Sequence, residues 1–253
     1  MNGYRRQMVN TGLGISYDMG SLLFTSTTSH QYLWDRMNMD QDYVPDDYFQ
    51  LMQEQKMNAL TQELVLRSKS DGIWQHTTGV YGSYQWLHTG APVTFGPGME
   101  AMLNGIMQRV LPVGHSLTFS NFHVPGDFKT PQLNVGVYHE TNLKLADRLM
   151  ATIGLRYDFV EVKNNFATTA LADLMYAMKI PERNIDMAVP IAYESAFAAN
   201  FKRTSNQLLP KFGLTWSFCD EGSNAYAVVS KGYCAGGYNL QAFSDIFQTE
   251  MNS

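Results

Sequence analysis

Long parts of the chain alternate apolar with polar residues. Because successive side chains of a β-strand point to opposite faces, this alternation predicts strands with one apolar and one polar face. The clearest stretch is 148–162, whose apolar positions are Leu149, Ala151, Ile153, Leu155, Tyr157 and Phe159. The stretch 205–218 follows the same rule, while the pattern is weaker near residue 25 and after residue 223. We expect strands in those two regions because of their neighbours.

The predicted strands are long. We expect about eight of them, arranged in four hairpins, near residues 9–18, 21–36, 59–70, 73–89, 130–145, 148–162, 205–218 and 224–238. Strands of soluble proteins usually run about 5 to 6 residues, whereas tilted strands that cross a membrane run about 9 to 11 or more. The length therefore favours a membrane barrel over a soluble sandwich.

The connections between these strands alternate in length. Tight turns are expected near residues 18–20, 70–72, 146–148 and 219–224, and long connections at roughly 38–58, 90–128 and 163–204. Short turns on one rim and long loops on the other are typical of outer-membrane barrels. The sequence thus predicts an all-β fold, a portion of an antiparallel transmembrane β-barrel with short periplasmic turns and long extracellular loops.

Each long connection contains a candidate helix. Pro45, Asp46 and Asp47 have the pattern of a helix start in the first, and a short helix is expected around residues 100–110 in the second. The third carries apolar residues at the i, i+3, i+4, i+7 spacing of an amphipathic helix, before a proline that would end it. These are Leu171, Leu174, Met175 and Met178, followed by Pro181. We expect this helix to pack on the barrel rim.

Composition and charge argue against several classes of protein. With 45% hydrophobic and 16% charged residues the chain is typical of neither disordered nor highly charged proteins. The formal net charge of −5 and the lack of a Lys/Arg run argue against binding nucleic acid. No apolar run approaches the roughly 18 residues of a membrane-spanning helix. The first residues, Met1 to Arg6, have no apolar stretch behind them, so we expect no signal peptide in this chain.

Residues with metal-binding or catalytic chemistry are scattered. The histidines form no close-spaced ligand pair with each other or with a cysteine, so no metal site is expected. The acidic first connection leaves open a calcium site or, by default, a solvated loop; its carboxylates are Asp40, Asp42, Asp46, Asp47 and Glu54. Cys219 and Cys234 should be too far apart along one hairpin for a disulfide. With no nucleophile elbow and no phosphate-binding glycine loop, we expect neither an enzyme nor a cofactor.

Three short motifs occur one after another along the chain. The first runs from Glu63 and Leu64 to Ser68, and the second is Gly154-Leu155-Arg156-Tyr157-Asp158. The third, segment 208–239, reads as two strands around a tight turn with a glycine-rich end. Its motif positions are Pro210, Lys211, Ser230, Lys231, Gly232, Tyr233, Gly236, Gly237 and Asn239.

These motifs resemble the barrel domain of TonB-dependent outer-membrane receptors. The resemblance is imperfect, because Val65 and Cys234 stand where that family usually has Arg, and Tyr238 replaces Phe. It implies that the motif residues have an architectural role. It further implies active uptake of a scarce extracellular ligand, most often a ferric siderophore, by a protein surrounded by outer-membrane lipid.

The same resemblance sets expectations about what the chain can do alone. Over residues 1–253 we expect a partial barrel domain without the family's plug domain, so that TonB would act only through a plug absent from this chain. Unpaired strand edges are costly in lipid. We therefore expect that this polypeptide alone is not a competent transporter.

Two other classes remain open. A complete eight-stranded membrane barrel could act as an adhesin, a pore or an enzyme, because barrels of that size close. A soluble secreted β-sandwich or propeller module could instead bury the same apolar faces in a core and bind carbohydrate or protein. The sandwich would stay in the aqueous phase, whereas the barrel would need detergent.

Overall fold

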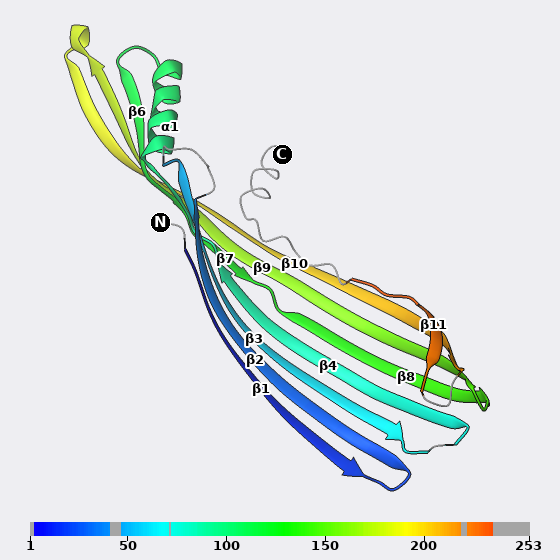
Figure 1. Cartoon of the computed structure of the whole chain (residues 1–253). Coiled ribbons are helices and arrows are strands. Elements are labelled where there is room, and N and C mark those ends of the chain that lie inside the picture. The colour runs from blue at the N-terminus through cyan, green and yellow to red at the C-terminus, as the bar shows by residue number, and fades with distance from the viewer. Residues whose placement is uncertain (1–2, 41–46, 71, 219–221, 235–253) are drawn as a thin grey trace.

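The chain folds into one antiparallel sheet with eleven strands, a single α-helix and one short 3₁₀ turn among the described residues. The computed structural model describes residues 3–40, 47–70, 72–218 and 222–234. Figure 1 shows the strands side by side in a long curved sheet that narrows towards the end carrying the helix. The all-β prediction is confirmed.

Eight strands form the four predicted hairpins. They are β1 (Gly3–Asp18), β2 (Leu22–Asp40), β3 (Phe49–Ser68), β4 (Trp74–Gly90), β8 (Gln132–Ala146), β9 (Leu149–Ile180), β10 (Ile185–Ser217) and β11 (Asn224–Ser230). All pairings are antiparallel, and the turns that join the two strands of each hairpin lie together at one end of the sheet. The last strand is shorter than predicted: residues 231–234 carry no regular structure, and residues 235–238 lie outside the described part.

The second long connection builds more sheet instead of a free loop. It contains β5 (Val93–Phe95), α1 (Pro97–Val110), β6 (His115–Val124) and β7 (Gly126–Lys129). The helix expected around residues 100–110 is therefore confirmed. β7 fits between β4 and β9, while β5 and β6 bridge β3 and β9 farther from the turns. In the described part of the chain, no helix combines the length and apolar character needed to cross a bilayer.

The third long connection differs most from the prediction. The amphipathic helix expected over Leu171 to Met178 is wrong, because β9 continues through this segment and returns as β10 without a break in register. Pro181 begins a 3₁₀ turn, Pro181–Arg183, and Asn184 closes the hairpin with a left-handed φ of 50°. In the strand, Leu171 and Met175 fall on one face and Leu174 and Met178 on the other, and β6 and β10 satisfy the backbone on both sides.

The expected helix start in the first connection is also not present where the structure describes it. Residues 45 and 46 lie outside the described part, Asp47 and Tyr48 have no regular structure, and Phe49 begins β3. Phe49 pairs with Phe95 of β5. This pairing supplies backbone hydrogen bonds that the short segment could not form as an isolated helical turn.

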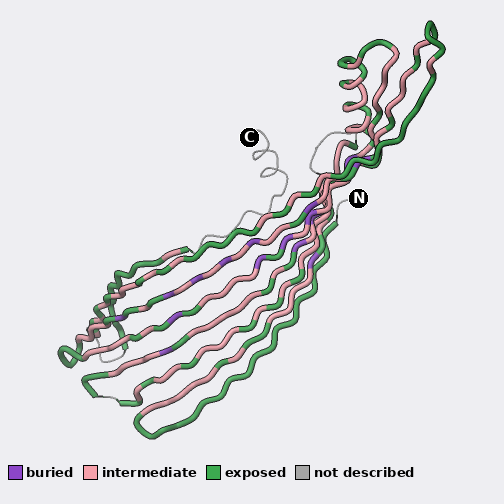
Figure 2. The backbone as a smooth tube through the Cα atoms, turned by 180° about the vertical axis from the view of Figure 1, so that it is seen from behind, coloured by how far each residue is buried: buried purple, intermediate pink, exposed green. Residues whose placement is uncertain are grey.

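Few apolar side chains are fully buried, because a single sheet has no second layer over most of its length. The buried ones lie on or beside β5, on β7 and along β9 (Figure 2), and they are Ala91, Val93, Phe95, Phe128, Val160, Val162 and Ala172. Many of the other large apolar residues, among them Leu13, Leu64 and Leu155, are exposed and share one face of the sheet. A soluble β-sandwich would cover this face with a second sheet, and the described residues contain only one.

Candidate functional site

The two faces of the sheet differ in how exposed their side chains are. We call the face that carries Leu155 the outward face, and the face that carries Arg156 the inward face. Ile153, Leu155 and Tyr157 on the outward face are 47%, 51% and 48% exposed, whereas Asp158 on the inward face is 7% exposed. The inward face is thus the more crowded, as expected on the concave side of a curved sheet.

The outward face has no charged residue over a broad band. Cross-strand partners share a face, so the register identifies the outward positions on each strand. Among the described outward positions of residues 7–17, 24–34, 58–66, 74–86, 133–143, 149–159, 204–216 and 225–229, none is Asp, Glu, Lys or Arg. A surface of this kind suits hydrocarbon, where charged side chains are costly.

The width of this band matches a bilayer. On β9 it runs from Leu149 to Phe159, about 33 Å along the strand at about 3.3 Å per residue. A tilt of about 45° reduces this to roughly 23 Å, close to the apolar band of about 25 Å on outer-membrane barrels. The outward face can therefore lie against lipid and the inward face can line a polar lumen.

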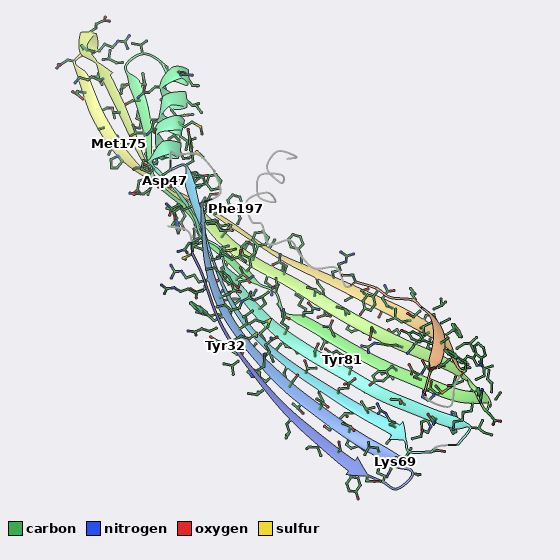
Figure 3. All side chains as sticks on the ribbon, viewed as in Figure 1. Tyr32, Asp47, Lys69, Tyr81, Met175 and Phe197 are labelled. Carbon is green, nitrogen blue, oxygen red and sulfur yellow. The ribbon has the colours of Figure 1, made fainter. Side chains whose placement is uncertain are left out.

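A network of polar side chains occupies the inward face near the middle of this band. Tyr138 of β8 donates its hydroxyl hydrogen bond to Glu63 of β3 at 2.9 Å. Arg156 of β9 donates through Nε to both carboxylate oxygens of Asp158, at 2.8 and 2.9 Å. The Arg156 guanidinium also lies 5.6 Å from the ring centroid of Tyr138 and 5.7 Å from that of Tyr81. Figure 3 shows Tyr81 midway along β4.

Glycines make the room for this network. A Cβ atom on Gly79 would lie 2.3 Å from Cζ of Tyr138, and one on Gly136 would lie 2.3 Å from Oδ1 of Asp158. Real Cβ atoms do not come this close to other heavy atoms. The tyrosine ring and the Asp158 carboxylate therefore lie directly on the backbone of a neighbouring strand, which keeps the wall thin where the side chains are largest.

Three further contacts extend the network towards β11. Lys211 of β10 donates to Glu140 of β8 at 2.8 Å, above Gly154 of the strand between them. Lys231, in the segment after β11, donates to Gln207 at 3.4 Å. In the same segment, the hydroxyl of Tyr233 contacts the Asp158 carboxylate.

The motif residues thus divide between the two faces. Glu63, Gly154, Arg156, Lys211, Lys231 and Tyr233 join or adjoin the inward network. Leu64, Leu155, Tyr157 and Pro210 fall on the outward positions of the same strands. Ser230 pairs with Lys211 at the end of β11, and Gly232 follows without regular structure. Gly236, Gly237 and Asn239 lie outside the described residues.

Several members of this network were not among the predicted site residues. They are Gly79, Tyr81, Gly136, Tyr138 and Glu140. The strand alternation could have identified them as candidates, because each lies on the same face as a motif residue. Which partners they contact depends on the cross-strand register, and the pattern of one strand does not contain that information.

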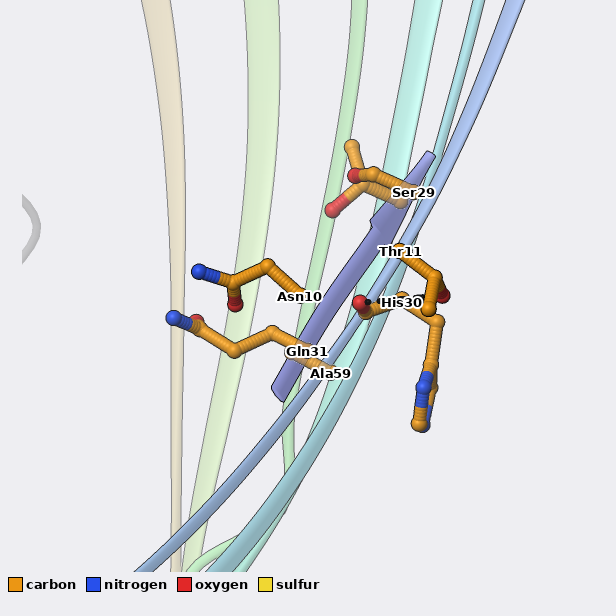
Figure 4. A pocket seen from close by; sticks show the side chains of 7 residues that line it. Asn10, Thr11, Ser29, His30, Gln31 and Ala59 are labelled. Atoms are coloured by element: carbon orange, nitrogen blue, oxygen red, sulfur yellow. Dashed lines mark hydrogen bonds between the residues drawn. The ribbon is translucent and has the colours of Figure 1, made fainter. Parts of the chain in front are cut away.

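A shallow hollow lies on the first three strands. It has a volume of about 260 Å³, and Asn10, Ser29, Gln31 and Thr61 supply its inward polar groups (Figure 4). Its lining has amides and hydroxyls but no carboxylate or amine. It can hydrogen bond to an uncharged polar group.

The sequence predicted neither a metal site formed by histidines nor a disulfide. Among the described residues, no three His, Cys, Asp or Glu side chains are grouped closely enough to hold a metal ion. Asp42 and Asp46 of the acidic connection lie outside that part of the chain. Cys234 is exposed, and Cys219 is not among the described residues, so the expectation about a disulfide stays a prediction.

Comparison with known families identifies the class of protein. A curved antiparallel sheet with an outward apolar band and an inward polar network is the wall of a membrane β-barrel. Residues 1–250 match the model of the TonB dependent receptor-like β-barrel family. The chain belongs to this family, whose members are outer-membrane receptors and transporters.

One solved receptor, FyuA, shares the fold. FyuA, the ferric yersiniabactin uptake receptor from Yersinia pestis, is similar with a TM-score of 0.63 and 15% identity, over 94% of this chain and 30% of that one. The siderophore receptor PiuA from Acinetobacter baumannii gives a TM-score of 0.47 at 12% identity, over 90% of this chain and 40% of that one. The chain thus spans less than half the length of either receptor. No curated protein sequence matches the chain.

Proposed function

We propose that this chain forms part of the barrel wall of an outer-membrane receptor that takes up a ferric siderophore, or a ligand of similar size, with energy delivered by TonB. The observation that carries the proposal is the division of the sheet into a charge-free outward face and an inward polar network. Family membership and the likeness in fold to FyuA, an uptake receptor for a ferric siderophore, support it. The ligand would bind at the end of the sheet opposite the hairpin turns.

In this scheme the motif residues have an architectural role. Hydrogen bonds from Tyr138 to Glu63 and from Lys211 to Glu140 connect strands that are not neighbours in the sheet. Such contacts fix the curvature of the wall, because each side chain reaches across an intervening strand. TonB would act through a plug domain inside the lumen and would not contact this wall. The scheme requires no catalysis and no cofactor.

Uptake can be tested in a bacterial host that lacks its own siderophore receptors. The full-length receptor that contains this chain and a plug domain is expressed in the outer membrane, and uptake of radiolabelled iron is measured with a panel of purified ferric siderophores under iron limitation. We expect uptake of at least one of them above the empty-vector level, and its loss in an otherwise identical host without TonB. If no ferric siderophore enters although the protein is present in the outer membrane, the proposed ligand class is wrong.

A further inference from the structure

Basic side chains follow the upper limit of the charge-free band on the outward face. Each of six strands contributes one, at the end of the band away from the hairpin turns. We name this row the basic belt, and it consists of Arg5, Arg36, Lys56, Lys129, Lys163 and Lys202.

The strand register makes the belt continuous. Arg5 of β1 is directly opposite Arg36 of β2, and Lys163 of β9 is directly opposite Lys202 of β10. Between these pairs, Lys56 is opposite His88, which is opposite Lys129. Like charges directly across a strand pair destabilise a sheet. The arrangement therefore has a cost that an anion bound between the cations would relieve.

Carboxylates compensate only part of this charge. Glu54 pairs with Lys56 at 3.0 Å, and Glu161 pairs with Lys163 at 3.0 Å and with Lys202 at 2.8 Å. Asp127 lies 2.6 Å from His88. Arg36 lies directly opposite Glu54, whose charge it shares with Lys56. Within the described part of the chain, no ion pair within 4 Å is found for Arg5 or Lys129. The belt as a whole retains an excess of positive charge.

The position of the belt determines what can reach it. Trp34 and Trp86 lie on the outward face two residues below Arg36 and His88, at the edge of the band. Tryptophan favours the interface between hydrocarbon and headgroups, so the belt lies at headgroup level. At the other edge of the band, near the turns, the outward residues are Tyr17, Leu149 and Trp216, without a comparable basic row. The positive charge therefore faces one leaflet only.

We propose that the basic belt binds the phosphate groups of anionic lipids in the leaflet around this end of the sheet. The proposal rests on the membrane placement given above. Arg5 and Arg36 together offer guanidinium donors that suit a phosphate in bidentate geometry, and each Lys adds a point charge at the same height. The protein is thereby held at a fixed depth in the membrane, with its long hairpin, β9 and β10, outside.

Lipid binding by purified protein tests the belt. The full-length receptor that contains this chain is expressed in the outer membrane of a bacterial host, purified in a neutral detergent and titrated with bisphosphorylated lipid A, with bound lipid counted by native mass spectrometry. The belt variant carries Arg5→Gln, Arg36→Gln and Lys129→Gln. The matched control carries Arg6→Gln, Arg67→Gln and Arg203→Gln, which remove the same charge from the inward face of β1, β3 and β10.

We expect about a fivefold loss of affinity per neutralised belt cation, so roughly a hundredfold for the belt variant, and little change for the control. Dephosphorylated lipid A should bind the wild-type protein as weakly as the belt variant binds the phosphorylated lipid. Equal binding of both lipids by the wild type, or equal losses in both variants, overturns the proposal.

Two checks separate the possible failures. If the belt variant does not fold, the single variant Lys129→Gln and the fall in wild-type affinity with rising salt test the same charge interaction. If the wild-type protein does not fractionate with the outer membrane, the membrane placement itself is wrong. Correct fractionation without any preference for phosphate would remove only the proposal about the belt.

Discussion

Substitution of Gly79 by alanine tests whether the inward network depends on the bare backbone beneath it. The new Cβ would lie 2.3 Å from Cζ, 2.4 Å from Oη and 2.7 Å from Cε1 of Tyr138. The ring would have to move by more than about 1 Å to reach an ordinary contact distance of about 3.5 Å. That movement breaks the 2.9 Å hydrogen bond to Glu63 and the contact with the Arg156 guanidinium.

The cost follows from the interactions that are lost. A hydrogen bond to a charged group contributes about 1.5 to 3 kcal/mol, and a half-exposed cation–π contact about 0.5 to 1 kcal/mol. We therefore expect Gly79→Ala to lower the free energy of unfolding by about 2 to 4 kcal/mol. Gly82→Ala is the matched control on the outward face of the same strand, because nothing lies within 4 Å of its added Cβ. It should be neutral or slightly stabilising.

The assay is a denaturant titration of the protein in lipid vesicles, followed by tryptophan fluorescence. A double variant that combines Gly79→Ala with Tyr138→Ala should lose less than the sum of the two single variants, since the alanine has no ring left to displace. Equal stability of the Gly79→Ala and Gly82→Ala proteins, or strictly additive losses, would show that Tyr138 does not depend on this glycine.

Three further outcomes follow from the same structure. Leu155→Arg should lower the free energy of unfolding in lipid by about 2 to 4 kcal/mol, because it places a charge on the outward face within the apolar band, and the same titration measures it. Breaking the part-exposed Lys211–Glu140 pair with Lys211→Met should cost at most about 1 kcal/mol in a double-mutant cycle with Glu140→Gln. At the turn rim, the hydrogen bond from Lys69 holds the pKa of the Asp18 carboxyl below its ordinary 3.8. The pair therefore stabilises the fold above that value and loses its effect as the pH falls through the lowered pKa, so Lys69→Gln should reduce the acid sensitivity of unfolding.

The sequence predicted the parts of the fold whose cause is local. Alternation over residues 148–162 identified a strand and its two faces, and the turns near residues 18–20 and 146–148 placed the hairpins. The helix expected around residues 100–110 is α1. Each of these depends on a few consecutive residues, so the pattern alone was sufficient.

The misassigned segment shows where local patterns fail. Leu171, Leu174, Met175 and Met178 have the spacing of a helix, but pairing with β6 and β10 makes the segment a strand with apolar residues on both faces. These partner strands are distant in sequence or follow the turn. A helix forms its backbone hydrogen bonds within its own segment, so it is the natural prediction when the partner strands are not known. Partners on both sides make the strand the better solution for the same residues.

The candidate site also has features that the sequence predicts and features that only the tertiary structure shows. By itself the sequence determined which residues share a face of each clearly alternating strand, because the period of a strand is fixed by its covalent geometry. Only the tertiary structure decided that Tyr138 reaches Glu63, that Gly79 lies beneath it, and that single basic residues on six strands form one belt. These contacts depend on register between strands, and register is set by the sum of many pairings across the whole sheet.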